Sequence, residues 1–389
     1  MSLNGQAYIV GAYEHPTRKA DDLSVARLHA DVAKGALDDA GLTKADIDGY
    51  FCAGDAPGLG TTTIAEYLGL KLRHVDSTEC GGSAPILHVA HAAEAIAAGR
   101  CNVALITLAG RPRAAGAALS LKAPDPDAPD VQFELPFGPA TQNLYGMVAK
   151  RHMHEYGTTS EQLAWIKVAA SHHAQHNPNA MLRNVVTVED VVNSPMVADP
   201  LHRLDCCVMS DGGGALIVAR PEIAKQLKRP LVKVRGTGEA PKHASGGRID
   251  LTWSAAKWSG AAAFAEAGVT PADIKYASIY DSFTITVLMQ LEDLGFCEKG
   301  AGGKFVEGGT LVAPDGKLPF NTDGGGLCNN HPGARGGMTK IIEAVRQVRG
   351  EANEGTQVAD VEIALAHGTG RLLGSRTGAA TLILGQEDA

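Results

Sequence analysis

The sequence lacks the features that mark membrane proteins and nucleic-acid-binding proteins. No apolar run approaches the roughly 18–20 residues of a membrane span, and the longest candidate, residues 85–98, is interrupted by His88, His91 and Glu94. No block of Lys or Arg offsets the net charge of −8, so nucleic acid and anionic membranes are poor candidates for the main partner. The first residues carry neither a charged nor an apolar signal region, so we expect no secretory signal peptide.

Cysteine is scarce and follows no recognisable pairing pattern. The seven cysteines are scattered and odd in number, and no spacing is typical of a zinc knuckle or a CxxC redox pair. His88 and His91 stand one helical turn apart without an evident third ligand, so we predict no metal site. Free thiols in a reducing cytoplasm are the simplest account of this cysteine usage. The adjacent Cys206 and Cys207 are interpreted as packing residues.

Glycine, by contrast, is abundant, at 46 of 389 residues, which indicates many tight turns and close backbone approaches. The length allows two domains of ordinary size, and the chain contains an internal repeat. Residues 36–47 and residues 263–274, an offset of 227, share the pattern Ala-x-x-x-Ala-Gly-x-Thr-x-Ala-Asp-Ile. We therefore expect two halves of one duplicated fold, over residues 1–225 and 226–389.

Hydrophobic periodicity predicts strands alternating with helices in both halves, which indicates an α/β fold with buried central helices. Helices are expected over residues 23–40, 64–70 and 81–98 of the first half, and over 253–268 and 336–348 of the second. Strands are expected at 7–12, 47–53, 103–109 and 212–219, then at 232–236, 276–280, 362–366 and 381–384. Residues 111–207, rich in Pro and Asp at their start, are predicted to form a loop or cap subdomain inserted in the first half.

Two reactive side chains precede predicted central helices. Cys80 precedes Gly81 and Gly82 in the first half, and His331 precedes Pro332 and Gly333 in the second. A helix N-terminus favours negative charge, so Cys80 is a candidate nucleophile held as a thiolate. His331 is a candidate base for that thiol and a donor to a substrate carbonyl. The alternatives are a buried structural cysteine and a helix-capping histidine.

Further candidates follow two predicted strands. The glycines of His367-Gly368-Thr369-Gly370 could supply oxyanion-hole amides, or form a plain turn. Tyr280, Asp281 and Ser282 end a strand where the crevice of an α/β sheet is expected, although Tyr280 could equally be a core residue.

Together these motifs resemble the thiolase superfamily. Cys80-Gly81-Gly82, Asn330-His331-Pro332-Gly333 and the glycines after His367 carry the general likeness. Four segments, residues 156–164, 177–180, 198–201 and 210–212, are more specific and resemble the sterol-carrier-protein-type thiolases and their lipid-transfer-protein relatives. The resemblance covers essentially the whole chain. It implies a five-layered αβαβα fold, usually dimeric, that acts on coenzyme A thioesters and becomes acylated on Cys80 with His331 as activator. We also expect the substrate-binding and oxyanion positions to be Gly368, Gly370, Asp281, Asn330 and Gly333.

The sequence departs from that family at the second catalytic cysteine. Tyr280-Asp281-Ser282-Phe283 stands where relatives have Asn-Glu-Ala-Phe or His-Asp-Cys-Phe, and His367 stands at the other place where a cysteine is usual. Three hypotheses follow: an acyltransferase through acyl-Cys80, with His331 or His367 replacing the missing cysteine; a retro-aldolase on a β-hydroxyacyl-CoA, with Tyr280 as base; and a non-catalytic CoA or lipid carrier. The paired Cys80 and His331 favour the first. A homodimer is expected. Relatives of this type often pair with a small OB-fold, zinc-ribbon protein, and the sequence leaves open whether this chain has such a partner.

Overall fold

Residues 2–53, 56–116, 135–138, 140–243, 245, 248–371 and 377–388 are described by the computed structural model, and the structural statements below concern these residues. The N-terminal half contains β1 (Tyr8–Glu14), α1 (Val25–Ala40), β2 (Gly49–Cys52), α2 (Thr61–Leu68), β3 (His74–Asp76), α3 (Ala84–Ala97), β4 (Val103–Gly110), β7 (Gly212–Ala219) and α8 (Pro221–Ala224). The C-terminal half contains β8 (Val232–Lys242), α9 (Ala256–Ala267), β9 (Tyr276–Ile279), α10 (Thr284–Asp293), α11 (Gly302–Val306), α12 (Gly336–Arg349), β10 (Ile363–Arg371) and β11 (Thr377–Gly385).

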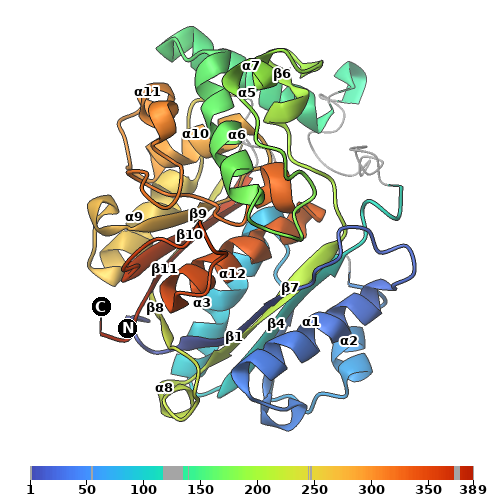
Figure 1. The fold of residues 1–389 in the computed structure, drawn as a ribbon. Coiled ribbons are helices and arrows are strands. Elements are labelled where there is room, and N and C mark those ends of the chain that lie inside the picture. The colour runs from blue at the N-terminus through green and yellow to red at the C-terminus, as the bar shows by residue number, and fades with distance from the viewer. Residues whose placement is uncertain are drawn as a thin grey trace.

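The strands form one sheet in the order β3-β2-β4-β7-β1-β8-β11-β10-β9. Among the described strands, the two halves of the sheet pair through Tyr8 with Lys233 and Ile9 with Val232, and around this seam the sheet folds into two layers (Figure 1). Successive residues of a strand face opposite sides of the sheet. In β10, the side chains of Ala364 and Ala366 therefore pack in the central hydrophobic cluster, whereas that of Leu365 packs in an outer cluster. The central cluster holds α3 and α12, and α1 and α9 cover the outer faces. This is the five-layered α/β/α/β/α arrangement that the sequence predicted.

The two copies of the sequence repeat make the same contacts in the structure. Helix α1 ends at Gly41 and α9 ends at Gly268, both in the left-handed conformation. In β1, a Cβ on Gly11 would lie 2.4 Å from the carbonyl oxygen of Ala36, and in β8 a Cβ on Gly236 would lie 2.2 Å from that of Ala263. Each helix therefore lies directly on its strand because the strand has a glycine there.

The two central helices are related by a second sequence offset, which differs from the 227 residues of the repeat. A 3-10 turn over Gly81–Ser83 leads into α3, and one over Gly333–Arg335 leads into α12; each helix is 14 residues long. With these elements aligned, the offset is 252, so Cys80 corresponds to Pro332 and His331 corresponds to Glu79. The two helix starts are equivalent, as expected, but Cys80 and His331 are one residue out of step.

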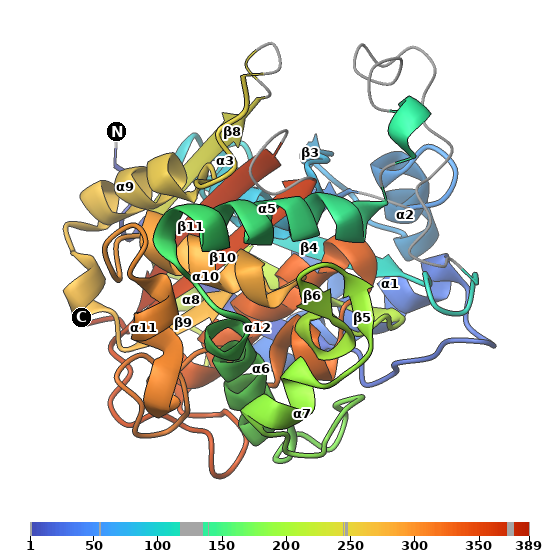
Figure 2. The same cartoon turned by 90° about the horizontal axis from the view of Figure 1, so that it is seen from above.

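The cap contains α5 (Thr141–Tyr156), α6 (Ser160–Ala174), α7 (Val188–Val192), β5 (Met196–Ala198) and β6 (Leu201–His202). The cap is inserted in the first half of the chain, but its helices α5 and α6 pack on the second half. Their buried side chains share a hydrophobic cluster with α10. Tyr145 of α5 lies against Phe283 with ring centroids 4.3 Å apart. Seen from above, α5 crosses over the molecule between α9 and α2 (Figure 2). The cap thus roofs the ends of the strands that carry the predicted site.

Candidate active site

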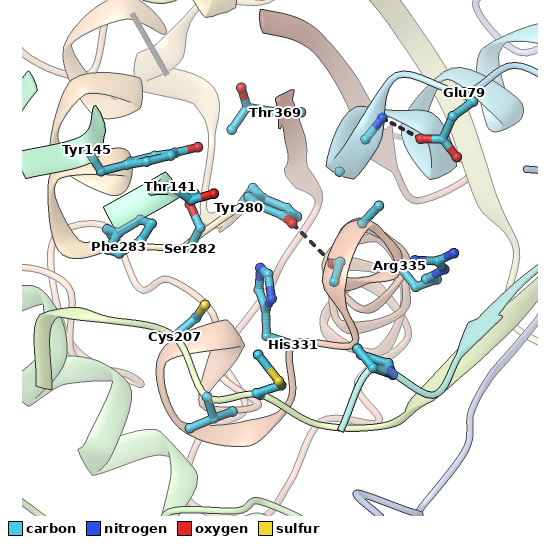
Figure 3. Close-up of a pocket in the computed structure, with 18 residues that line it drawn as sticks. Glu79, Thr141, Tyr145, Cys207, Tyr280, Ser282, Phe283, His331, Arg335 and Thr369 are labelled. Atoms are coloured by element: carbon cyan, nitrogen blue, oxygen red, sulfur yellow. Dashed lines mark hydrogen bonds between the residues drawn. The ribbon is translucent and has the colours of Figure 1, made fainter. Parts of the chain in front are cut away.

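A cavity of about 470 Å³ lies beneath the cap, at the starts of α3 and α12 (Figure 3). Its walls come from segments far apart in the chain. The helix starts contribute Glu79, Gly81, Gly82, His331, Gly333, Ala334 and Arg335; the strand ends contribute Tyr280, Ser282, Phe283, Thr369 and Gly370; residues 112–209 contribute Pro112, Thr141, Tyr145, Cys207, Val208 and Met209.

Tyr280 stands at the centre of this cavity. It follows β9, and its ring lies so close to Gly82 that a Cβ there would be 2.3 Å from Cε2. Its hydroxyl donates to the carbonyl oxygen of Gly333 at 3.2 Å, and its ring meets His331 edge-on with centroids 5.3 Å apart. Burial raises the pKa of Tyr280 well above its ordinary value, helped by nearby Cys207. The hydroxyl is therefore neutral and can relay a proton only if it passes its own proton on.

His331 is held by its backbone. The N–H of His331 donates to Ser210 Oγ at 3.0 Å, while no described group forms a hydrogen bond with its buried Nε2. Burial lowers the pKa of His331 to about 4. The imidazole is consequently neutral at neutral pH and can accept a proton or donate one hydrogen bond.

Asp281 and Asn330 position the loop before His331 and do not line the cavity. The carboxylate of Asp281 accepts from the N–H groups of Gly326 and Leu327 at 2.9 and 3.2 Å, and it pairs with buried Lys340 at 2.9 Å. Asn330 donates from Nδ2 to Glu14. The sequence placed both residues against substrate, whereas their side chains in the structure hold protein backbone and neighbouring side chains.

His367 is also directed away from the cavity. The strand β10 continues through Gly368 and Gly370, which were expected to supply oxyanion-hole amides or to form a turn, so its alternation sends His367 to the α9 side together with Thr381, whose Oγ1 lies 2.8 Å from Nδ1. Burial lowers the pKa of His367 to about 3. The histidine therefore stands on the wrong face of the sheet to replace a cavity cysteine. Gly370 does line the cavity, and Gly368 packs on the start of α3.

Cys80 lies beside the cavity and behind its surface. Within the described part of the chain, its turn contributes Glu79, Gly81 and Gly82 to the wall, and Cys80 is not among the wall residues. Its half-buried side chain packs against the central cluster, and a Cβ on Gly378 would lie 3.3 Å from the Cβ of Cys80.

Ser282 lines the cavity, as predicted, and its hydroxyl lies 3.1 Å from that of Thr286. The sequence interpretation missed Cys207, which was assigned to packing, and also Glu79, Thr141, Tyr145 and Arg335. Glu79 could have been identified from the 252-residue offset, because it is the counterpart of His331. The cap residues gave no such signal, because only the packing of α5 on the second half brings them here.

The electrostatic setting favours developing negative charge. Two 14-residue helices start at the cavity wall, and a helix N-terminus presents unpaired N–H groups and the positive end of the helix dipole. Arg335, at the start of α12, also lines the wall, but its guanidinium lies against Gly110 of β4, where a Cβ would be 3.1 Å from Nε. An enolate or oxyanion formed in this cavity would be stabilised there.

Among the described residues, no three His, Cys, Asp or Glu side chains are grouped as a metal site would require. His91, predicted to lack a third ligand, pairs instead with Asp76 at 2.7 Å and Glu239 at 3.3 Å. No described helix is long and apolar enough to cross a bilayer.

Comparisons with known proteins agree with this fold. Residues 238–386 match the family model described as thiolase C-terminal domain-like. The chain is 34% identical to an acetyl-CoA acetyltransferase of Methanothermobacter thermautotrophicus, over 93% of this chain and 95% of that protein. It is 36% identical to 17-hydroxy-3-oxo-4-pregnene-20-carboxyl-CoA lyase of Mycobacterium tuberculosis, over 95% and 97%. Among solved structures, the Ltp2-ChsH2(DUF35) aldolase matches with a TM-score of 0.87 and 34% identity, over 99% of each chain.

Proposed function

The chain belongs to the thiolase superfamily, in its sterol-carrier-protein-type subgroup, and on that premise we propose that it is a retro-aldolase acting on coenzyme A thioesters. It would split a β-hydroxyacyl-CoA into a carbonyl compound and a shorter acyl-CoA. The observation that carries the proposal is the composition of the cavity wall: Tyr280 and His331 line the cavity together, whereas Cys80 does not.

The proposed chemistry needs a proton acceptor at the β-hydroxyl and a site for the thioester enolate. Tyr280 takes the hydroxyl proton while its own proton passes through a bound water to His331, whose low pKa leaves the imidazole neutral and able to accept it. The bond between the α- and β-carbons then breaks. The enolate oxygen lies at the helix starts, where backbone N–H groups favour negative charge.

The test is product analysis with a panel of β-hydroxyacyl-CoAs, monitored for the carbonyl product and the shortened acyl-CoA. We expect cleavage without any covalent adduct in the intact mass of the protein. Because the pKa of His331 is about 4, cleavage should persist down to about pH 5 and fall as the pH drops through 4, where the imidazole is protonated. Formation of an acyl-protein in place of cleavage products would contradict the proposal.

A second candidate is acyl transfer through Cys80. It is favoured by the place of Cys80, at the residue before the 3-10 turn that begins α3, and by the similarity to an acetyl-CoA acetyltransferase. It requires the thiol to turn toward the cavity when substrate binds. An acyl adduct on Cys80, located by peptide mass spectrometry after incubation with acyl-CoAs, is its signature.

We also propose that the chain assembles with other subunits. The name Ltp2-ChsH2(DUF35) aldolase couples Ltp2 with ChsH2(DUF35), and a small partner protein of that kind is expected here, alongside a homodimer of this chain. Light scattering of the purified chain, alone and after co-expression with a DUF35 protein, tests both expectations.

A further inference from the structure

The proposed retro-aldol reaction leaves one proton unassigned, and the cavity offers a group for it. When the bond between the α- and β-carbons breaks, the β-hydroxyl oxygen loses its proton and becomes a carbonyl oxygen. The α-carbon of the enolate must gain a proton. Tyr280 and His331 serve the first transfer. A donor to the α-carbon must lie on another part of the wall.

Cys207 is held firmly on that wall. Its N–H donates to the carbonyl oxygen of Ser282 at 2.9 Å, and the next N–H, of Val208, donates to Gly326 at 2.9 Å. The first bond fixes the residue to the loop after Tyr280, and the second fixes it to the loop before His331. Figure 3 shows the Cys207 sulfur directed toward the His331 ring. Two backbone contacts thus place this thiol beside both groups of the proposed proton relay.

Two other titratable groups of the wall, Glu79 and Arg335, are less suitable. Glu79 turns back to accept the N–H of Gly81 at 2.7 Å, and its side chain is exposed. Arg335 does not release its proton in proteins. Burial, with Cys206 and Asp281 nearby, raises the pKa of Cys207, so this thiol keeps its proton and is suited to donating it to a carbanion, and not to nucleophilic attack.

We propose that Cys207 is the catalytic acid that protonates the α-carbon of the enolate, a role that rests on the proposed carbon–carbon lyase activity. The Cα–Cβ bond breaks, its electron pair forms the enolate, and a new C–H bond forms with the Cys207 proton. The resulting thiolate regains a proton from His331, which holds the proton that left the β-hydroxyl through Tyr280. The net change moves one proton from oxygen to carbon, without any oxidant or reductant.

The experiment is exchange of α-protons of an acyl-CoA product, such as propionyl-CoA, in D2O, followed by mass spectrometry. Exchange needs the α-carbon acid and the enolate site, and no β-hydroxyl. We expect Cys207→Ala and Cys207→Ser to slow exchange by about 100-fold or more. Cys206→Ser is the matched control, because the Cys206 sulfur is directed to the carbonyl of His202 at 3.4 Å; it should exchange at the wild-type rate.

Equal exchange in the wild type and both Cys207 variants, or no exchange in the wild type, would overturn the role of Cys207. Thermal melting of the two variants checks that they fold, and Cys207→Ser keeps the size of the side chain. Failure of the proposed function looks different: the wild type would exchange α-protons in a manner dependent on Cys207 yet cleave no β-hydroxyacyl-CoA. That outcome would keep the acid role and assign it to a different thioester reaction.

Discussion

The starts of α3 and α12 share one backbone plan and present different chemistry. Each has a three-residue 3-10 turn followed by a 14-residue helix. At the position two residues before the turn, one carries Glu79 and the other His331, and both side chains line the cavity. At the next position, Cys80 packs against the central cluster while Pro332 occupies the equivalent site. The two helix starts therefore share one backbone conformation. They differ in single residues, and the imidazole of His331 is on the α12 side.

The largest effect should come from removing the groups on the α12 side of the cavity. Tyr280→Phe and His331→Ala should each lower the rate of β-hydroxyacyl-CoA cleavage by about 10²–10⁴-fold, because positioned acid–base groups contribute that much. Cys80→Ala should keep the rate within a few-fold of wild type. Steady-state kinetics of the three variants decide the comparison; a cleavage defect in Cys80→Ala as large as that of Tyr280→Phe would reverse it.

A smaller effect is expected in thiol reactivity. Burial is the first cause of the raised pKa of the other six cysteines, reaching about 11 for Cys52 and Cys101 and about 12 for Cys206 and Cys297. Only thiolates react quickly, so Cys80 should be alkylated by iodoacetamide at neutral pH at least about tenfold faster than these residues. Time-resolved peptide mapping measures each rate. Uniform rates across all seven cysteines would show that Cys80 is an inert core residue.

The third test compares Gly82 with Ala334, its counterpart at the 252-residue offset. A Cβ at residue 82 would lie 2.3 Å from the Tyr280 ring and 2.4 Å from the carbonyl oxygen of Thr369. Gly82→Ala should therefore destabilise the protein by about 1–3 kcal/mol and disturb Tyr280. Ala334→Gly is the control and should change stability less. Urea denaturation measures the stability of both variants. A Gly82→Ala variant with wild-type stability and activity would show that the contact of residue 82 with Tyr280 and Thr369 can adjust at little cost.

The smallest effect concerns His91, which lies on α3 and joins the two halves through Asp76 of β3 and Glu239 of β8. The hydrogen bond to Glu239 is the main cause that raises the pKa of His91 to about 9. A folded pKa above the unfolded value means that this stabilisation is complete below about pH 6.5 and is lost as the pH rises through 9. The melting temperature of wild type should therefore converge on that of His91→Gln between those values; a constant difference would contradict the assignment.

The sequence was a good guide wherever local pattern determines the structure. The 36–47 and 263–274 repeat predicted a duplicated α/β fold, and the glycines before α3 and α12 marked the two helix starts. Tyr280, Ser282, His331, Gly333 and Gly370 do line the cavity. These predictions depend on periodicity and on turn residues, which act over a few positions.

Other site residues depended on information that a linear pattern does not contain. His367 was expected beside substrate because it stands where relatives have their second cysteine; instead the strand continues to Arg371, and its register directs the histidine to α9. Cys207 was assigned to packing because nothing in residues 111–207 indicates that the cap folds back on the second half. Helix α10 was not predicted either, since its apolar run follows directly on the strand pattern.

The cavity wall also constrains how the protein becomes active during synthesis. Thr369 and Gly370 close one side of the cavity, whereas Gly81 and Gly82 close another, almost 300 positions earlier. A nascent chain that has not yet extruded β10 lacks Thr369 and Gly370, so one side of its pocket is still missing. Catalytic competence therefore comes late in biosynthesis and nearly all at once, so a ribosome-bound fragment would have little chance to act on thioesters.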